Sequence, residues 1–171
     1  DFLRYIVEYL KKHKKRISPK ETMSYGYWLV KFEKVESEIL EVWECNADGA
    51  EFVKGANLAL LYWRDQHRIC SHYNAQFKAP SLNQLTVTSK GVLEGLPLKA
   101  VRYPSPSHMS GWWLITDQYD GNIHSLNNEH TFHITAARPE LAKFLALPDG
   151  FRFHSDSEKA WFDEEVANST A

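Results

Sequence analysis

The chain has 171 residues, of which 43% are hydrophobic and 25% are charged, and its formal net charge is −2 at pH 7. This length accommodates one domain or two small ones, and the composition allows a sizeable apolar core. The slightly negative charge argues against a general nucleic-acid-binding protein, because such proteins present a strongly basic face.

Cysteine content and hydropathy bear on the cellular compartment and on membrane insertion. Cys45 and Cys70 are too few for a disulfide framework, and they fit reduced thiols in a cytoplasmic protein. No run of about 18 apolar residues occurs, so we predict no transmembrane helix. The sequence shows no signal peptide either, although a chain that begins at Asp1 leaves room for a trimmed one.

The first predicted elements are a helix and a β-hairpin. Apolar residues recur at helical spacing over residues 2–14, and the basic run that follows predicts a solvated helix end, where cations complement the helix dipole. Residues 25–35 predict a strand with Trp28, Val30 and Phe32 on one face. A turn at 36–38 and a second strand at 39–45 complete the hairpin, and a run of turn residues ends it.

A long amphipathic helix is predicted over about residues 57–74. Asn57 is expected to cap its start, and Asn74 to end it in a left-handed conformation. Gln66 interrupts an otherwise apolar stripe. The members of that stripe are Ala59, Tyr62, Trp63, Ile69, Cys70 and Tyr73. Residues 77–83 predict a linker into the second half of the chain.

The second half begins with short strands predicted at 85–88 and 98–103 and then reaches the most unusual stretch of the sequence, residues 103–126. Within it, residues 112–116 form a short apolar run with high strand propensity. Because side chains alternate across a strand, Trp112 and Trp113 are predicted to face opposite sides.

The stretch is expected to end with a turn at Asp120-Gly121 and a second extended piece around Ile123. Beyond it, the pattern over residues 129–135 fits a strand or a helix equally well. Pro139 predicts the first turn of a helix over about 139–146, and a last short strand follows at 151–153. Residues 157–166 predict an acidic, loosely attached helix or tail.

The predicted elements do not follow a regular strand–helix–strand order. Within the predicted strands, apolar and polar residues alternate, and the strands are not continuously apolar. The sequence therefore predicts an α+β fold with a mostly antiparallel sheet and two or three packed helices. Residues 1–80 and 81–171 are expected to form an N-terminal and a C-terminal region, either as two domains or as one continuous domain.

Catalytic and metal sites find little support. His130 and His133 lie three apart, whereas the zinc-hydrolase helix motif needs histidines four apart with glutamate directly after the first. A second metal set, also without a paired-ligand signature, comprises His67, Cys70, His72 and Cys45. Ser110 lacks the glycine two residues before it that a nucleophile elbow requires. Paired carboxylates at a turn usually make local hydrogen bonds and are weak evidence for acid–base catalysis. We therefore predict no enzyme activity, no metal and no cofactor.

A binding role fits the central stretch better. Aromatic side chains stand beside carboxylates there, which is the composition of a protein-interaction hot spot for a basic partner. The expected contact residues are Tyr103, Trp112, Trp113, Asp117, Tyr119 and Asp120.

The order of short motifs also carries a family resemblance. Val87-Thr88-Ser89-Lys90 precedes Val92-Leu93-Glu94-Gly95, and Ser110-Gly111-Trp112 then leads into a strand. An acidic turn, Ile123-His124-Ser125-Leu126, an apolar helix and Phe151-Arg152-Phe153 follow. In this order, residues from about 87 to 152 resemble the immunity-protein family thirty-three domain of bacterial polymorphic-toxin immunity proteins.

The resemblance implies a cytoplasmic bacterial antidote that binds and neutralises a cognate secreted toxin, with no catalysis of its own. Charge and hydropathy separately predict no nucleic-acid or membrane partner. Systems of this kind, including type VI secretion, serve competition between bacteria. Two alternatives stay open at this point. One is a small metal-dependent hydrolase that uses His130, His133 and Asp117, and the other is an adaptor or chaperone that loads the toxin.

Overall fold

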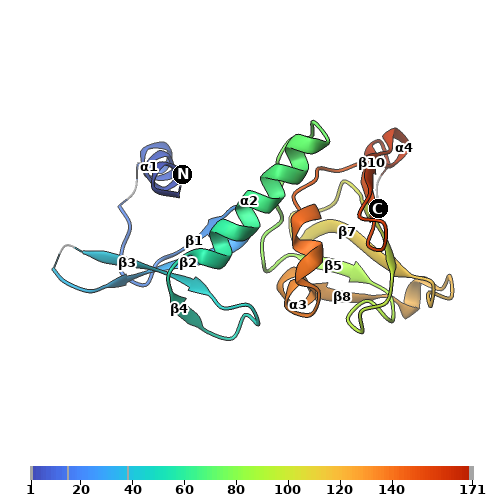
Figure 1. The fold of residues 1–171 in the computed structure, drawn as a ribbon, viewed down its shortest axis with the longest axis horizontal. Helices are drawn as coiled ribbons and strands as arrows, with labels where there is room; N and C mark the ends of the chain where they lie inside the picture. The colour runs from blue at the N-terminus through green and yellow to red at the C-terminus, as the bar shows by residue number, and fades with distance from the viewer. Residues whose placement is uncertain (1, 15, 38, 170–171) are drawn as a thin grey trace.

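A computed structural model describes residues 2–14, 16–37 and 39–169 of the chain (Figure 1). The helices are α1 (Phe2–His13), α2 (Asn57–His72), α3 (Thr131–Ala137) and α4 (Glu164–Ala167), with 3-10 helices η1 (Ile123–Ser125) and η2 (Pro139–Phe144). The first strands are β1 (Thr22–Tyr25), β2 (Trp28–Lys34), β3 (Leu40–Cys45), β4 (Phe52–Lys54) and β5 (Leu85–Thr88). The later strands are β6 (Leu98–Arg102), β7 (Met109–Thr116), β8 (Asn127–His130), β9 (Phe151–His154) and β10 (Ala160–Phe162).

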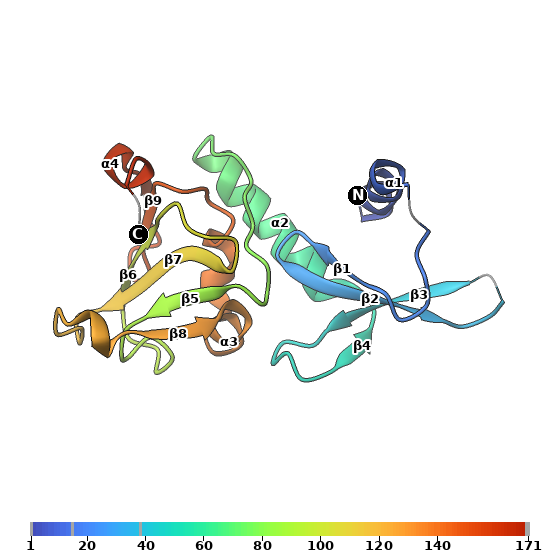
Figure 2. The same cartoon turned by 180° about the vertical axis from the view of Figure 1, so that it is seen from behind.

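The strands form two sheets that lie on opposite sides of α2 (Figures 1 and 2). The first sheet has the order β1-β2-β3-β4, and the second has the order β10-β9-β6-β7-β5-β8. Among the described strands, β5 and β7 pair in parallel and the other pairs are antiparallel. The predicted α+β class with a mostly antiparallel arrangement and packed helices is therefore confirmed.

The N-terminal elements follow the predicted pattern with one correction. Trp28, Val30 and Phe32 face the core from β2, as predicted. The strand predicted from Tyr25 to Val35 is, however, two strands, because Gly26 adopts a positive φ of 59° and turns the chain between β1 and β2. The predicted turn at 36–38 includes Glu38, which lies outside the described residues.

The long helix α2 joins the two sheets through its buried stripe. Gln66 is fully buried in that stripe, and its side-chain amide donates to the carbonyl oxygen of Ala142 at 2.8 Å. Asn74 has a positive φ of 49°, as predicted. The predicted Asn57 cap is wrong, since Asn57 is the first helical residue and the two following amides instead donate to the carboxylate of Glu44 on β3, at 3.1 and 2.7 Å.

The structure corrects two predictions in the second half and resolves a third that was left open. The extended piece expected around Ile123 is the 3-10 helix η1, and the ambiguous residues 129–135 divide between β8 and α3. The acidic tail expected at 157–166 contains β10, which pairs with β9 before α4 begins. Pairing with a distant strand sets the conformation of β8 and β10, whereas local hydrogen bonds between Asn122 and residues 124 and 125 hold η1.

Two buried arginines hold the connections of the second half together. Arg102, 3% exposed, donates to the carbonyl oxygens of Ser110, Lys78, Leu145 and Leu147 at 3.0, 2.5, 3.1 and 2.6 Å. Arg138, 7% exposed, donates to the carbonyl oxygens of Val92 and Leu96 at 3.1 and 3.0 Å. These guanidinium groups supply donors to backbone carbonyls, four of them in buried hydrogen bonds, that would otherwise lack this partner.

Candidate functional site

The two adjacent tryptophans of β7 face opposite sides of the sheet, as predicted. Trp112 is fully buried in the core, where its indole N–H donates to the carbonyl oxygen of Leu145 at 3.0 Å. Trp113 is half-buried on the other face, and its ring makes an edge contact with Tyr103 at a centroid distance of 5.9 Å. The expectation that Trp112 contacts a partner is therefore wrong, because its side chain has no accessible surface.

The Ser110-Gly111 pair forms an irregularity in β7. The register between β5 and β7 shifts at this point, and Gly111 has a φ of 82°. A Cβ atom at Gly111 would lie 2.4 Å from the carbonyl oxygen of Tyr103, so the position requires glycine. Ser110 is buried and its hydroxyl shares a 2.7 Å hydrogen bond with that of Thr86, which gives this serine a structural role.

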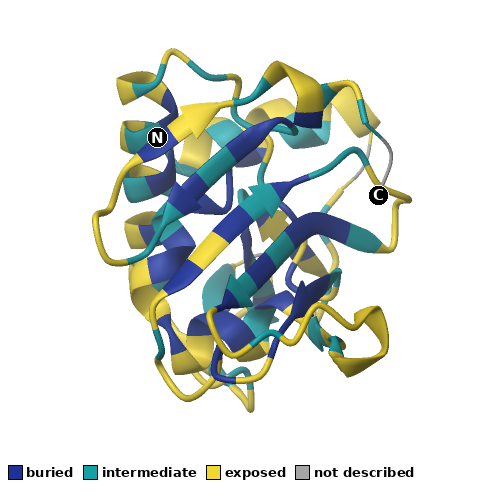
Figure 3. Cartoon of the chain, turned by 90° about the vertical axis from the view of Figure 1, so that its right-hand side faces the viewer, coloured by how far each residue is buried: buried dark blue, intermediate teal, exposed yellow. Residues whose placement is uncertain are grey.

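The side chains opposite the core form an open surface, which we call the outer sheet face. Figure 3 shows this side of the second sheet with no long helix in front of its strands. Directly paired residues place their side chains on the same face, so one row crosses all six strands. Its members are Trp161, Arg152, Val101, Trp113, Val87 and Asn128, of which Val87 is buried. A second, parallel row contains His154, Lys99 and Ile115.

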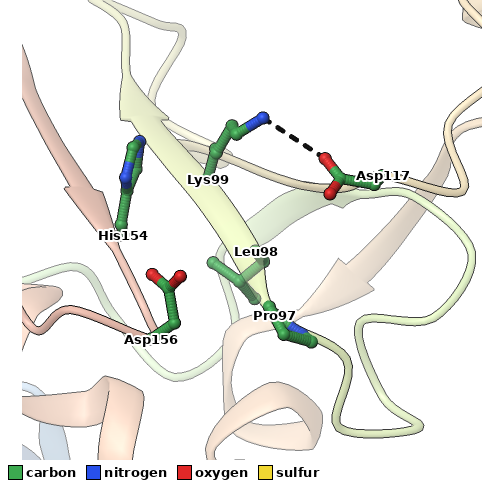
Figure 4. A pocket seen from close by; sticks show the side chains of 6 residues that line it. All are labelled: Pro97, Leu98, Lys99, Asp117, His154 and Asp156. Atoms are coloured by element: carbon green, nitrogen blue, oxygen red, sulfur yellow. Dashed lines mark hydrogen bonds and ion pairs between the residues drawn. The ribbon is translucent and has the colours of Figure 1, made fainter.

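One border of the outer sheet face is a small charged pocket (Figure 4). Asp117 follows β7 directly, and its carboxylate accepts from the ammonium group of Lys99 at 3.2 Å. His154 and Lys99 point to the same side of their strands, and Asp156 lies beside them. Both partners of the Lys99–Asp117 pair are largely exposed, so the pair is weak and can exchange for other partners.

The other predicted carboxylate, Asp120, stabilises a turn. It accepts from the backbone N–H of Asn122 at 2.9 Å and from the hydroxyl of Ser125 at 2.8 Å. The backbone hydrogen bond, aided by the Ser125 hydroxyl, lowers the pKa of Asp120, so this exposed group keeps its negative charge. Tyr119 is half-buried in the same turn. The structure thus groups Tyr103 with Trp113 and places Asp117, Tyr119 and Asp120 together at the far end of β7.

Sequence reasoning missed the contributions of Arg152 and Trp161 to this face. Arg152 donates to Asp163 at 2.7 Å, and Trp161 is 40% exposed beside His154, with ring centroids 5.0 Å apart. The apolar–basic alternation of residues 151–153 is a signal that could have placed Arg152 outward. Nothing in the local sequence indicates that Trp161 lies on an edge strand.

The metal hypotheses receive no geometric support. His130 pairs with Leu85, which in turn pairs with the first residue of β7. Asp117 directly follows the last residue of β7, about 25 Å farther along that strand. The ligand set of the hydrolase alternative is therefore split. In the described ranges, no three His, Cys, Asp or Glu side chains are grouped to hold an ion. The thiols of Cys45 and Cys70 are buried, and burial raises both pKa values, that of Cys70 to about 11.

The family comparison agrees with the part of the chain that forms the second sheet. A family model described as the Imm33-like domain matches residues 65–163, more than half of the chain. The chain belongs to the Imm33-like family. Comparisons with curated proteins and with solved structures found no match. Within the described part of the chain, no helix is long and apolar enough to cross a membrane.

The Imm33-like match starts inside α2 and ends just after β10, so it contains all six strands of the second sheet. It confirms the resemblance inferred from residues 87–152 and extends it at both ends. Helix α1 and the first sheet precede it, yet they share the buried core, for example through a 2.8 Å hydrogen bond between the hydroxyls of Tyr27 and Thr135. The division of the chain near residue 80 stays a prediction.

Proposed function

We propose that this protein is a cytoplasmic bacterial immunity protein that binds a cognate secreted toxin and neutralises it by occluding its active site. Membership of the Imm33-like family is the observation that carries this proposal. On this proposal the protein acts by stoichiometric binding and performs no catalysis. The contacts come from the outer sheet face and its border, through Tyr103, Trp113, Asp117, Tyr119 and Asp120.

The composition of this surface supports a binding role. Trp113 and Tyr103 form an adjacent aromatic pair on an open sheet, and tryptophan, tyrosine and arginine are the residues that dominate protein-interaction hot spots. Carboxylates at the border then favour one partner orientation over others. A strand-based surface is also well suited to covering the mouth of another protein's active site, because ladder hydrogen bonds on both sides hold the backbone of its inner strands.

Co-expression provides the direct test. The toxin encoded beside this gene is expressed in a sensitive bacterium with and without this protein, and growth and complex formation by affinity purification are measured. We expect restored growth and a stoichiometric complex. A complex without restored growth would instead identify a loading adaptor or chaperone, and the lack of any complex would refute the proposal.

A further inference from the structure

The surface of the second half of the chain is more acidic than the sequence indicates. Residues 81–169 contain eleven Asp and Glu and seven Lys and Arg. Arg102 and Arg138 are buried, which leaves five basic side chains at the surface, whereas none of the eleven acidic residues is buried. Residues 1–80 differ, with thirteen Lys and Arg against eleven Asp and Glu. Negative charge is therefore concentrated on the half that carries the outer sheet face.

The basic groups on that face are already paired with carboxylates. Lys99 is bonded to Asp117 at 3.2 Å, and Arg152 to Asp163 at 2.7 Å. The side chain of Asp117 is 91% exposed and can therefore also meet a cation from outside. Asp156 adds a further exposed carboxylate at the same border. The centre of the face is aromatic and aliphatic, and its border is acidic.

We propose that the toxin surface docked here has an apolar centre, which packs on Trp113 and Tyr103, surrounded by lysine and arginine side chains that pair with Asp117 and Asp156. This inference rests on the proposed function, since it names the chemistry of the partner at the same site. Opposite charges at the rim accelerate encounter, and the aromatic centre supplies most of the affinity.

Two other occupants fit the face less well. A single-stranded nucleic acid could stack on Trp113 and Trp161, but its phosphates need free cations, and Lys99 and Arg152 are held by carboxylates. A second copy of this chain would bring two acidic borders together, and such like-charge contacts oppose association. A basic protein surface is the occupant that the charge distribution favours.

The test measures binding of the purified, catalytically inactivated toxin to the full chain by surface plasmon resonance. Trp113→Ala is compared with Trp43→Ala, because Trp43 is a half-buried tryptophan of the first sheet, in register with Lys31 and Lys54. We expect Trp113→Ala to weaken binding by roughly 30-fold or more and Trp43→Ala by less than about threefold. Circular dichroism and thermal melting confirm that both variants are folded.

The charged rim is tested with the double variant Asp117→Asn, Asp156→Asn. Its association rate should fall by about three- to tenfold at low salt and match the wild-type rate at high salt. The control is Glu51→Gln, an exposed carboxylate of the first half.

The outcomes separate the two proposals. If the wild-type chain binds no toxin, the proposed function fails and this inference fails with it. If a complex forms but Trp113→Ala binds as tightly as the wild type, or the rim variant binds faster, only the docking surface is wrong. Binding of a single-stranded oligonucleotide that Trp113→Ala abolishes would also overturn the assignment.

Discussion

Replacing Arg102 with methionine removes the group that binds four backbone carbonyls, three from connections and one from β7. The guanidinium donates to oxygens from the linker after α2, from β7 and from the loop after η2. Burial lowers the pKa of Arg102 to about 10, and nearby Asp149 opposes this shift, so the group stays charged at neutral pH. Methionine fills a similar volume but donates no hydrogen bond.

The structure sets the size of the expected loss. Leu145 keeps one donor, the indole N–H of Trp112, and the carbonyl of Lys78, an exposed residue, is open to water, so the loss falls mainly on the buried bonds to Ser110 and Leu147. Each buried carbonyl left without a donor costs about 1–3 kcal/mol, but water entry and relaxation make the sum less than additive. We expect a loss of about 3–5 kcal/mol, a large share of the roughly 5–15 kcal/mol that stabilises a typical domain.

Urea unfolding followed by tryptophan fluorescence measures this loss. With an m-value of about 2 kcal/mol/M, the midpoint should fall by about 2 M. Arg68→Met is the control, because the side chain of Arg68 is 70% exposed, and its midpoint should move by less than about 0.3 M. If Arg102→Met shifts the midpoint no more than this control, the carbonyls have other donors and the reasoning is wrong.

Four further predictions concern single positions. Glu44→Ala should destabilise the protein by about 1–2 kcal/mol in urea unfolding, because two first-turn amides of α2 lose their acceptor, and Glu44→Gln should recover part of the loss. Gly111→Ala should cost more than about 2 kcal/mol in the same assay, whereas Gly121→Ala, with a similar φ but open space around its Cβ position, should cost about 1 kcal/mol. Native Cys70 should react with a thiol reagent at least about a hundredfold more slowly than in the unfolded chain, because its raised pKa leaves few thiolate ions; fast native labelling would contradict its burial. The hydrogen bond that Arg152 donates lowers the pKa of Asp163 in the folded protein. The stabilisation from this bond is therefore complete above the unfolded pKa of Asp163, near 3.9, and is lost as the pH falls through the lower folded pKa. Acid unfolding curves of Asp163→Asn should lack this component.

Much of the fold could be predicted where neighbouring residues carry the information. The helical periodicity of α1 and α2, the alternation of β2 and the opposite directions of Trp112 and Trp113 depend on backbone geometry that repeats every few residues. The motif order from residue 87 to residue 152 likewise indicated the family that the comparison confirmed.

The candidate site could be predicted only in part. Trp113 and Asp117 were expected because they stand in one distinctive stretch of sequence. Lys99, Arg152 and Trp161 join them from strands up to about fifty residues away in the chain, and only the pairing of β10, β9, β6 and β7 places them on one face. Local sequence does not encode which strand will be a neighbour.

By itself, the sequence determined the class of fold, the family, and the type and approximate bounds of the elements with strong periodicity. Only the tertiary structure decided that Trp112 is buried, that Glu44 on β3 caps helix α2, and that Arg102 donates to buried backbone carbonyls. The physical reason is that periodicity is a property of one segment, whereas burial, capping across elements and charge pairing depend on which distant segments meet.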